Sequence, residues 1–198
     1  GQYQETVDKH LPELQQCQRD GLTRFLGVTE LYERDSSHDM IRRLLADGLF
    51  DVFMIGHNML TPTALPELFP EAQRKNIGVV VMCAVRTVIS TPDMLRDHIR
   101  EWKAEGALPK DAVPDDKPLD WVLGGEAKTI TDAAYKFAAE SPAVGSVLTG
   151  TASEEHLLEN IRAILGAPLP REVSKRLEDT FTPVNRSVQA RIGAPNRR

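Results

Sequence analysis

The chain has 198 residues, of which 41% are hydrophobic and 27% charged, and its formal net charge is −5. These proportions are typical of a globular protein, and the acidic balance argues against non-specific nucleic-acid binding, which depends on clustered lysine and arginine. No apolar run approaches the length of a membrane span. Cys17 and Cys83 have no metal-type partner nearby, so we expect two free thiols and a cytoplasmic location.

The first half of the chain predicts helices that alternate with short buried strands. Apolar runs typical of buried strands occupy 24–28, 51–55 and 78–85. Amphipathic helices are predicted over 6–20, from a cap at Ser36 or Ser37 to Gly48, and over 63–75. Each of the three strands is therefore preceded by a helix.

The second half continues the alternation after an interruption. Helices are predicted over 92–104, 127–140, 153–165 and 171–182, and a fourth strand over 145–148. The proline- and aspartate-rich stretch 107–119 predicts a long surface loop, and the polar, basic tail 183–198 is expected to be loose.

Short apolar strands that alternate with helices predict an α/β fold with a parallel sheet. Periodicity alone leaves two architectures open, because a small doubly wound domain and half of an eight-stranded barrel share this pattern. A complete four-stranded domain with its own function also stays open.

Five segments, taken in chain order, resemble the aldo-keto reductase superfamily. The sequences GLTRFLGVT, DVFMIGHN, NIGVVV and PAVGSVLTG, at 21–29, 51–58, 76–81 and 142–150, are similar to strands five to eight of that family's barrel. The last of them leads into ASEEHLLEN at 152–160, which is similar to the start of the family's last barrel helix. The resemblance implies a (β/α)8 TIM barrel of which residues 1–165 supply about four βα units, the C-terminal half, with 166–198 as a C-terminal helix and tail.

For function, the resemblance implies part of a nicotinamide-dependent oxidoreductase that reduces a small carbonyl compound, or oxidises an alcohol, by hydride transfer with NADP or NAD. The family's catalytic Asp, Tyr, Lys and His would all precede residue 1, so we expect this chain alone to be inactive and assign it no catalytic residue. We expect it to associate with the missing N-terminal half or with itself, and not with nucleic acid or a membrane. The alternative is a catalytically degenerate, reductase-like binding or regulatory module.

The segment that follows the fourth strand carries most of the cofactor residues that the resemblance implies. Backbone amides at a helix N-terminus favour a phosphate group, and the residues placed there are Gly150, Thr151, Ala152 and Ser153. Glu159 and Asn160 match the family's adenine-contacting pair, and the position that meets the 2′-phosphate of NADP falls near Ala152 or His156, of which His156 could serve only partly because it is mostly neutral at pH 7. The structural alternative is that Ser153 only caps the helix and that Asn160 faces solvent.

The nicotinamide side departs from the family pattern. Thr29 keeps the hydroxyl expected beside the carboxamide, but Glu30 replaces an asparagine and Met54 replaces a glutamine. Arg86 is a further candidate anion contact. Outside this set, we expect His57 to pack in the core, and His38 with Asp39 to cap a helix or lie exposed. The sequence contains no zinc-type spacing and no nucleophile elbow.

Overall fold

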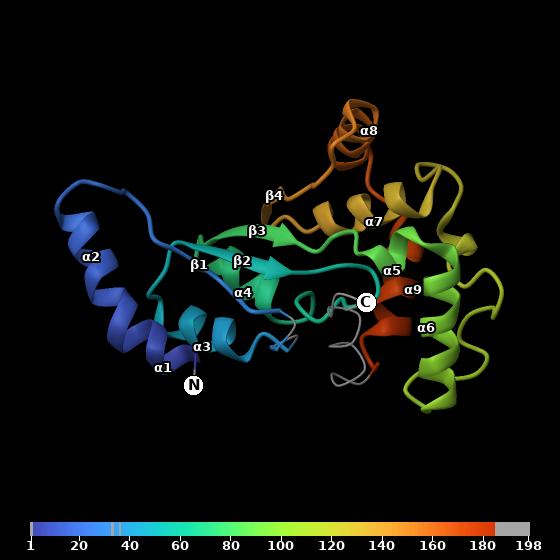
Figure 1. Cartoon of the computed structure of the whole chain (residues 1–198), viewed down its shortest axis with the longest axis horizontal. Coiled ribbons are helices and arrows are strands. Elements are labelled where there is room, and N and C mark those ends of the chain that lie inside the picture. Colours follow the sequence, from blue (N-terminus) through green and yellow to red (C-terminus); the bar gives the residue numbers. More distant parts are fainter. Residues whose placement is uncertain (1, 33, 36, 185–198) are drawn as a thin grey trace.

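Figure 1 shows the computed structural model, which describes residues 2–32, 34–35 and 37–184. Most of the tail predicted to be loose lies outside the described residues. The strands are β1 (Gly27–Thr29), β2 (Val52–Gly56), β3 (Gly78–Met82) and β4 (Val144–Val147). They form one parallel four-stranded sheet in the order β1-β2-β3-β4, which confirms the predicted parallel α/β fold. Within the described chain this order lacks the reversal that marks a doubly wound sheet.

The helices follow the predicted order, with some changes of boundary. They are α1 (Gln2–Glu5), a π-helical turn (Thr6–His10), α2 (Leu11–Arg19), α3 (Asp39–Asp47), α4 (Leu68–Arg74), α5 (Thr87–Ser90), α6 (Pro92–Ala104), a 3-10 turn (Asp120–Val122), α7 (Ile130–Ala139), α8 (Glu154–Leu165) and α9 (Arg171–Phe181). The sequence did not predict α5, and α4 is shorter than the predicted 63–75 helix. No helix in the described chain is long and apolar enough to cross a membrane.

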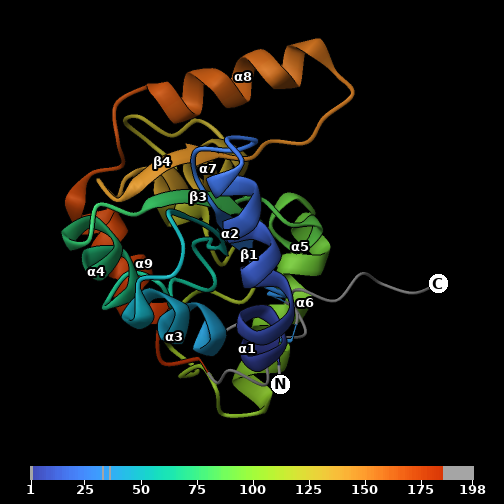
Figure 2. The ribbon, with the colours of Figure 1, turned by 90° about the vertical axis from the view of Figure 1, so that its left-hand side faces the viewer.

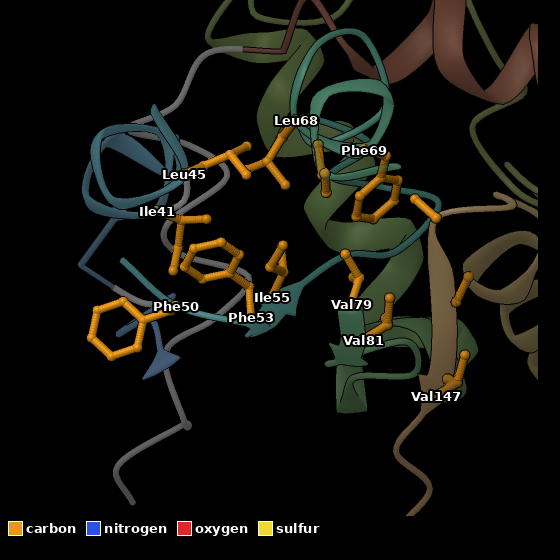
Figure 3. Packing of buried hydrophobic residues seen from close by; sticks show 14 of the residues in the cluster. Ile41, Leu45, Phe50, Phe53, Ile55, Leu68, Phe69, Val79, Val81 and Val147 are labelled. Atoms are coloured by element: carbon orange, nitrogen blue, oxygen red, sulfur yellow. The ribbon is translucent and has the colours of Figure 1, made fainter. Parts of the chain in front are cut away.

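One face of the sheet is covered by α3 and α4 (Figure 3). Alternate residues of a strand point to the same face, and Phe53, Ile55, Val79 and Val81 are at most 1% exposed against these helices. The opposite face carries the register row Thr29, Met54, Val80 and Ser146, whose members are half-buried or exposed. The sheet is therefore covered on one face only within the described chain.

A second hydrophobic cluster is built from helices that lie largely beyond the carboxyl ends of the strands in Figure 1. It joins α5, α6, α7 and α9, and its largest members are Trp102, Phe137 and Phe181, each fully buried. The stretch 107–119 has no helix or strand, as predicted, but it is not simply a surface loop. Leu108 and Val113 of this stretch are buried in the same cluster as residues of α6. These apolar residues therefore anchor the stretch to the protein.

The start of α3 differs from the prediction. Ser36 lies outside the described residues, and the carboxylate of Asp35 accepts hydrogen bonds from the amides of Asp39 and Met40 at 2.9 and 2.8 Å. Asp35 therefore caps the helix. The helix ends at Gly48, as predicted, where φ is 65°, a conformation that glycine adopts without strain.

Candidate functional site

A cavity of about 1220 Å³ opens between the loop after β3, helix α7 and the β4–α8 segment. It brings together five of the residues predicted to bind a cofactor, Gly150, Thr151, His156, Glu159 and Asn160. The other three predicted residues do not line it. Ala152 is exposed beside the cavity, Ser153 is turned toward α8, and Thr29 lies on β1.

A polar cluster ties α7 to α8 at the wall of the cavity. The Asn160 side-chain amide donates to Thr149 Oγ1 at 2.6 Å, and the Tyr135 hydroxyl donates to the same oxygen at 2.9 Å. Asn160 is only 8% exposed, so the expectation that it faces solvent is wrong. One of its N–H donors is engaged, and the second N–H and the amide oxygen are the groups that a ligand could use.

The N-terminus of α8 is partly satisfied by its own side chains. Ser153 Oγ accepts from the amide of His156 at 3.3 Å, so the predicted capping role is confirmed. Thr151 Oγ1 accepts from the amide of Ser153 at 3.1 Å. At Gly150, a Cβ would meet no atom within 4 Å, which leaves open space at the cavity wall where a ligand could approach the backbone.

Charged side chains of both signs line the cavity. The basic ones are Arg86, Lys128, Lys136 and Arg162, and the acidic ones are Glu126, Asp132 and Glu159. Arg86 Nη1 donates to Cys83 Sγ at 3.2 Å, and Lys136 Nζ donates to the carbonyl of Ala167 at 2.8 Å. Sequence reasoning missed the contribution of α7, because its polar residues have ordinary helical spacing and no motif marks which of them turn inward.

The side chain of Glu30 does not enter this cavity. It is fully buried at the end of β1, where Oε1 accepts from the amide of Gly56 at 2.7 Å and Oε2 lies 2.8 Å from His38 Nδ1. The second ring nitrogen of His38 lies 2.9 Å from Thr63 Oγ1. His38 stands at the N-cap position of α3, as predicted, but its side chain makes no cap hydrogen bond and is not exposed. The residue is fully buried with a left-handed backbone (φ 62°), because Glu30 and Thr63 together bind both of its nitrogens.

Tyr32 also packs at the ends of β1 and β2, beside the Glu30–His38 pair. Its ring lies against the backbone of Gly56, where any Cβ would overlap it, and its hydroxyl donates to Thr61. It also stacks beside His38, with ring centroids 6.1 Å apart. Burial raises the pKa of the Tyr32 hydroxyl, so the phenol stays protonated at neutral pH. We call Glu30, Tyr32, His38, Thr61 and Thr63 the buried polar plug.

His57 packs in the core, as predicted. It is fully buried, with its ring 4.9 Å from Phe69 in an edge contact and 5.3 Å from Phe137 in a stacked one. Burial, and secondarily the nearby His38, lower its pKa to about 3. Neither ring nitrogen has a hydrogen-bond partner among the described residues. The described chain also contains no group of three potential metal ligands.

The fold and the cavity define a parallel α/β protein whose open site lies at the carboxyl ends of β3 and β4, the usual position of a site in such folds. The sequence model of the aldo/keto reductase family matches residues 2–180, and the chain belongs to this family. It is 25% identical over 165 residues to L-galactose dehydrogenase of Arabidopsis thaliana, a match that covers 83% of this chain and 49% of that protein.

Among solved structures, the chain is similar to aldo-keto reductase AKR11C1 from Bacillus halodurans, in its holo and apo forms. The TM-score is 0.60 in both comparisons and the identity 16%, and the match covers 92% of this chain and 59% or 60% of the other. This likeness supports the fold. The chain spans about half the length of the curated relative and about three-fifths of the solved structure.

Proposed function

We propose that the chain is the C-terminal half of a nicotinamide-dependent oxidoreductase of the aldo-keto reductase type, with β1 to β4 as barrel strands five to eight. Residues 1–165 would form the half barrel, and 166–198 the C-terminal helix and tail. The strand order and the order of the five sequence segments support this assignment. The family match over 2–180 supports the family alone. The uncovered row Thr29, Met54, Val80 and Ser146 would then face the barrel interior.

The observation that carries the proposal is the convergence of five predicted cofactor residues on one cavity. Its volume of about 1220 Å³ is ample for an adenine nucleotide. Asn160 and Glu159 would hold the adenine base, and Gly150, Thr151 and His156 the phosphates. When bound, the reduced cofactor (NADPH or NADH) would supply a hydride to a carbonyl, and the oxidised cofactor would accept one from an alcohol. The groups of this chain bind and orient the nucleotide, and we assign none of them to proton transfer.

Calorimetric titration of the chain with NADP⁺ and with NAD⁺ tests this site. We expect saturable binding of at least one of them, weakened about three- to tenfold in Glu159→Ala, because a hydrogen bond from an exposed side chain contributes about 0.5–1.5 kcal/mol. Glu172→Ala, the same substitution at an exposed position of α9, is the matched control. Absence of binding by both nucleotides would contradict the proposal.

The catalytic residues of the parent enzyme would lie outside this chain. We therefore expect no consumption of NADPH or NADH by the chain alone in the presence of a small aldehyde or ketone, as followed by nicotinamide absorbance. Turnover by the isolated chain would overturn this assignment. Turnover that appears only after addition of an N-terminal half barrel would support it.

We also propose that the chain associates with an N-terminal half barrel or with a second copy of itself. Strands β1 and β4 each have one edge without a partner strand in the described chain. Helix α8 packs against α7, and Figures 1 and 2 place it on the side of β4, away from α1 and α3. The exposed apolar side chains of α8 are Leu157, Leu158, Ile161 and Leu165. Open edges and apolar patches favour association, so a sharp monomer in sedimentation velocity, with a cooperative melt, would contradict this proposal.

The alternative function is a reductase-like binding or regulatory module. The buried polar plug favours it, because Glu30 stands where the family has an amide that holds the nicotinamide. Combination with an N-terminal half barrel discriminates the two functions. Hydride turnover would support the enzyme, and nucleotide binding without turnover would support the module.

A further inference from the structure

We infer that this chain recognises a nicotinamide dinucleotide through its adenosine phosphate end, and that the nicotinamide end raises the affinity by less than tenfold. The inference rests on the proposed function, because it concerns the same cavity. It goes beyond that function by naming the part of the ligand that is recognised, and it predicts that simple adenosine phosphates are complete ligands.

The first argument is that the polar groups at the ends of β1 and β2 are already bonded to one another. A carboxamide needs a donor for its oxygen and an acceptor for its NH₂ group. Both carboxylate oxygens of Glu30 are occupied, one by the amide of Gly56 and the other by His38. The remaining nitrogen of His38 is bonded to Thr63. The side chains of Glu30 and His38 are fully buried, and a ligand cannot reach them without breaking the plug.

The uncovered face of β1 and β2 offers few groups that could bind a carboxamide. Met54, in register with Thr29, has only a thioether, which is a weak acceptor and not a donor. Thr29 keeps a hydroxyl on an exposed position. A single exposed hydroxyl changes affinity by less than tenfold, because it exchanges one hydrogen bond with water for another.

The cavity lies away from β1 and β2. Its lining starts at Met82, at the end of β3, and continues through α7 to the β4–α8 segment, with no residue from β1 or β2. The polar groups on its wall include several that suit a base and phosphates, namely Asn160, Thr149 and the basic side chains Arg86 and Lys128, beside the acidic side chains described above. The cavity therefore lies at the ends of β3 and β4, whereas the buried polar plug lies at the ends of β1 and β2.

Calorimetry on the full chain with matched ligands tests the inference. The pairs are NADP⁺ against adenosine 2′,5′-bisphosphate, and NAD⁺ against ADP, with nicotinamide mononucleotide as the complementary half. We expect each dinucleotide to bind less than tenfold tighter than its adenosine partner, and nicotinamide mononucleotide not to bind at about millimolar concentration. A dinucleotide advantage of tenfold or more, or measurable binding of nicotinamide mononucleotide, would overturn the inference and leave the proposed function standing. If no ligand binds, the proposed function itself fails.

A charge placed in the cavity gives an independent readout. Gly150→Asp adds a carboxylate where the structure leaves open space, so it should fold normally. We expect this variant to weaken the binding of ADP and of NAD⁺ by the same factor, at least tenfold, because the added carboxylate repels the phosphates that both ligands carry. Gln15→Asp, which adds the same charge at an exposed position on α2, is the matched control. If Gly150→Asp weakens the binding of ADP but not that of NAD⁺, the dinucleotide has a second point of attachment and the inference is wrong.

Discussion

The buried His57, whose ring nitrogens have no hydrogen-bond partner in the described part of the chain, makes the stability of the chain depend on pH. Its pKa is lowered from 6.5 to about 3 in the folded chain, first by burial and then by His38. The unfolded chain therefore binds a proton below about pH 6.5 while the folded chain does not, so stability is complete above this value and falls as the pH falls. Between about pH 7.5 and about pH 5 this linkage removes about 2 kcal/mol, and the loss continues toward the folded pKa.

His57→Phe tests this reasoning, because phenylalanine keeps an aromatic ring between Phe69 and Phe137 and cannot take up a proton. Urea unfolding is measured at both pH values for the wild type and the variant. The free energy of unfolding of the wild type should fall by about 2 kcal/mol more than that of His57→Phe. His10→Gln, at an exposed histidine, controls for removal of a histidine as such. Equal losses in the wild type and His57→Phe would refute the argument.

Three further substitutions test local structure by urea unfolding at neutral pH. Gly56→Ala should lower the free energy of unfolding by about 3 kcal/mol, because its Cβ overlaps the ring of Tyr32. Glu30→Ala should cost about 3 kcal/mol, since it leaves His38 and the Gly56 amide buried without a partner. Asp35→Ala should cost about 1 kcal/mol, because it removes the cap of α3, and the loss should appear as reduced helicity in circular dichroism.

Each of these variants has a control of the same type at a permissive position. Gly150→Ala meets no neighbouring atom and should be close to neutral. Glu126→Ala and Asp111→Ala, both at exposed positions, should each change stability by less than about 0.5 kcal/mol. A cost at Gly56, Glu30 or Asp35 no larger than that of its control would show that the contact described there does not stabilise the fold.

The alternation of strands and helices could be predicted because it depends on local patterns. Helix α6 runs from Pro92 to Ala104, the predicted range, since a proline favours the first position of a helix. The position of His38 could not be predicted. Its left-handed backbone and its burial depend on Glu30 and on Thr63, which lies 25 residues later in the chain. Asp35 and Ser37 are both good capping residues, and only the geometry of the turn selects Asp35.

The same limit applies to the candidate site, whose two sides could be predicted to different extents. The segment after β4 carries its residues in one continuous motif, and five of them meet in the cavity. The residues that α7 contributes, such as Tyr135, and those of the buried polar plug come from separate elements. Sequence comparison could identify Glu30 as a departure from the family pattern. It could not show that this carboxylate is turned away from any ligand.

The buried polar plug also imposes a free-energy cost on a ligand that extends from the ends of β3 and β4 to the ends of β1 and β2. A nicotinamide carboxamide that bound at the ends of β1 and β2 would have to displace Glu30 from His38 and from the amide of Gly56. Leaving those buried groups without their partners costs about 3 kcal/mol, which corresponds to about a hundredfold in affinity. New hydrogen bonds to the carboxamide would have to offset this whole cost before the nicotinamide end contributed anything. Occupation of the open cavity at β3 and β4 requires no such displacement, because Gly150 faces open space there.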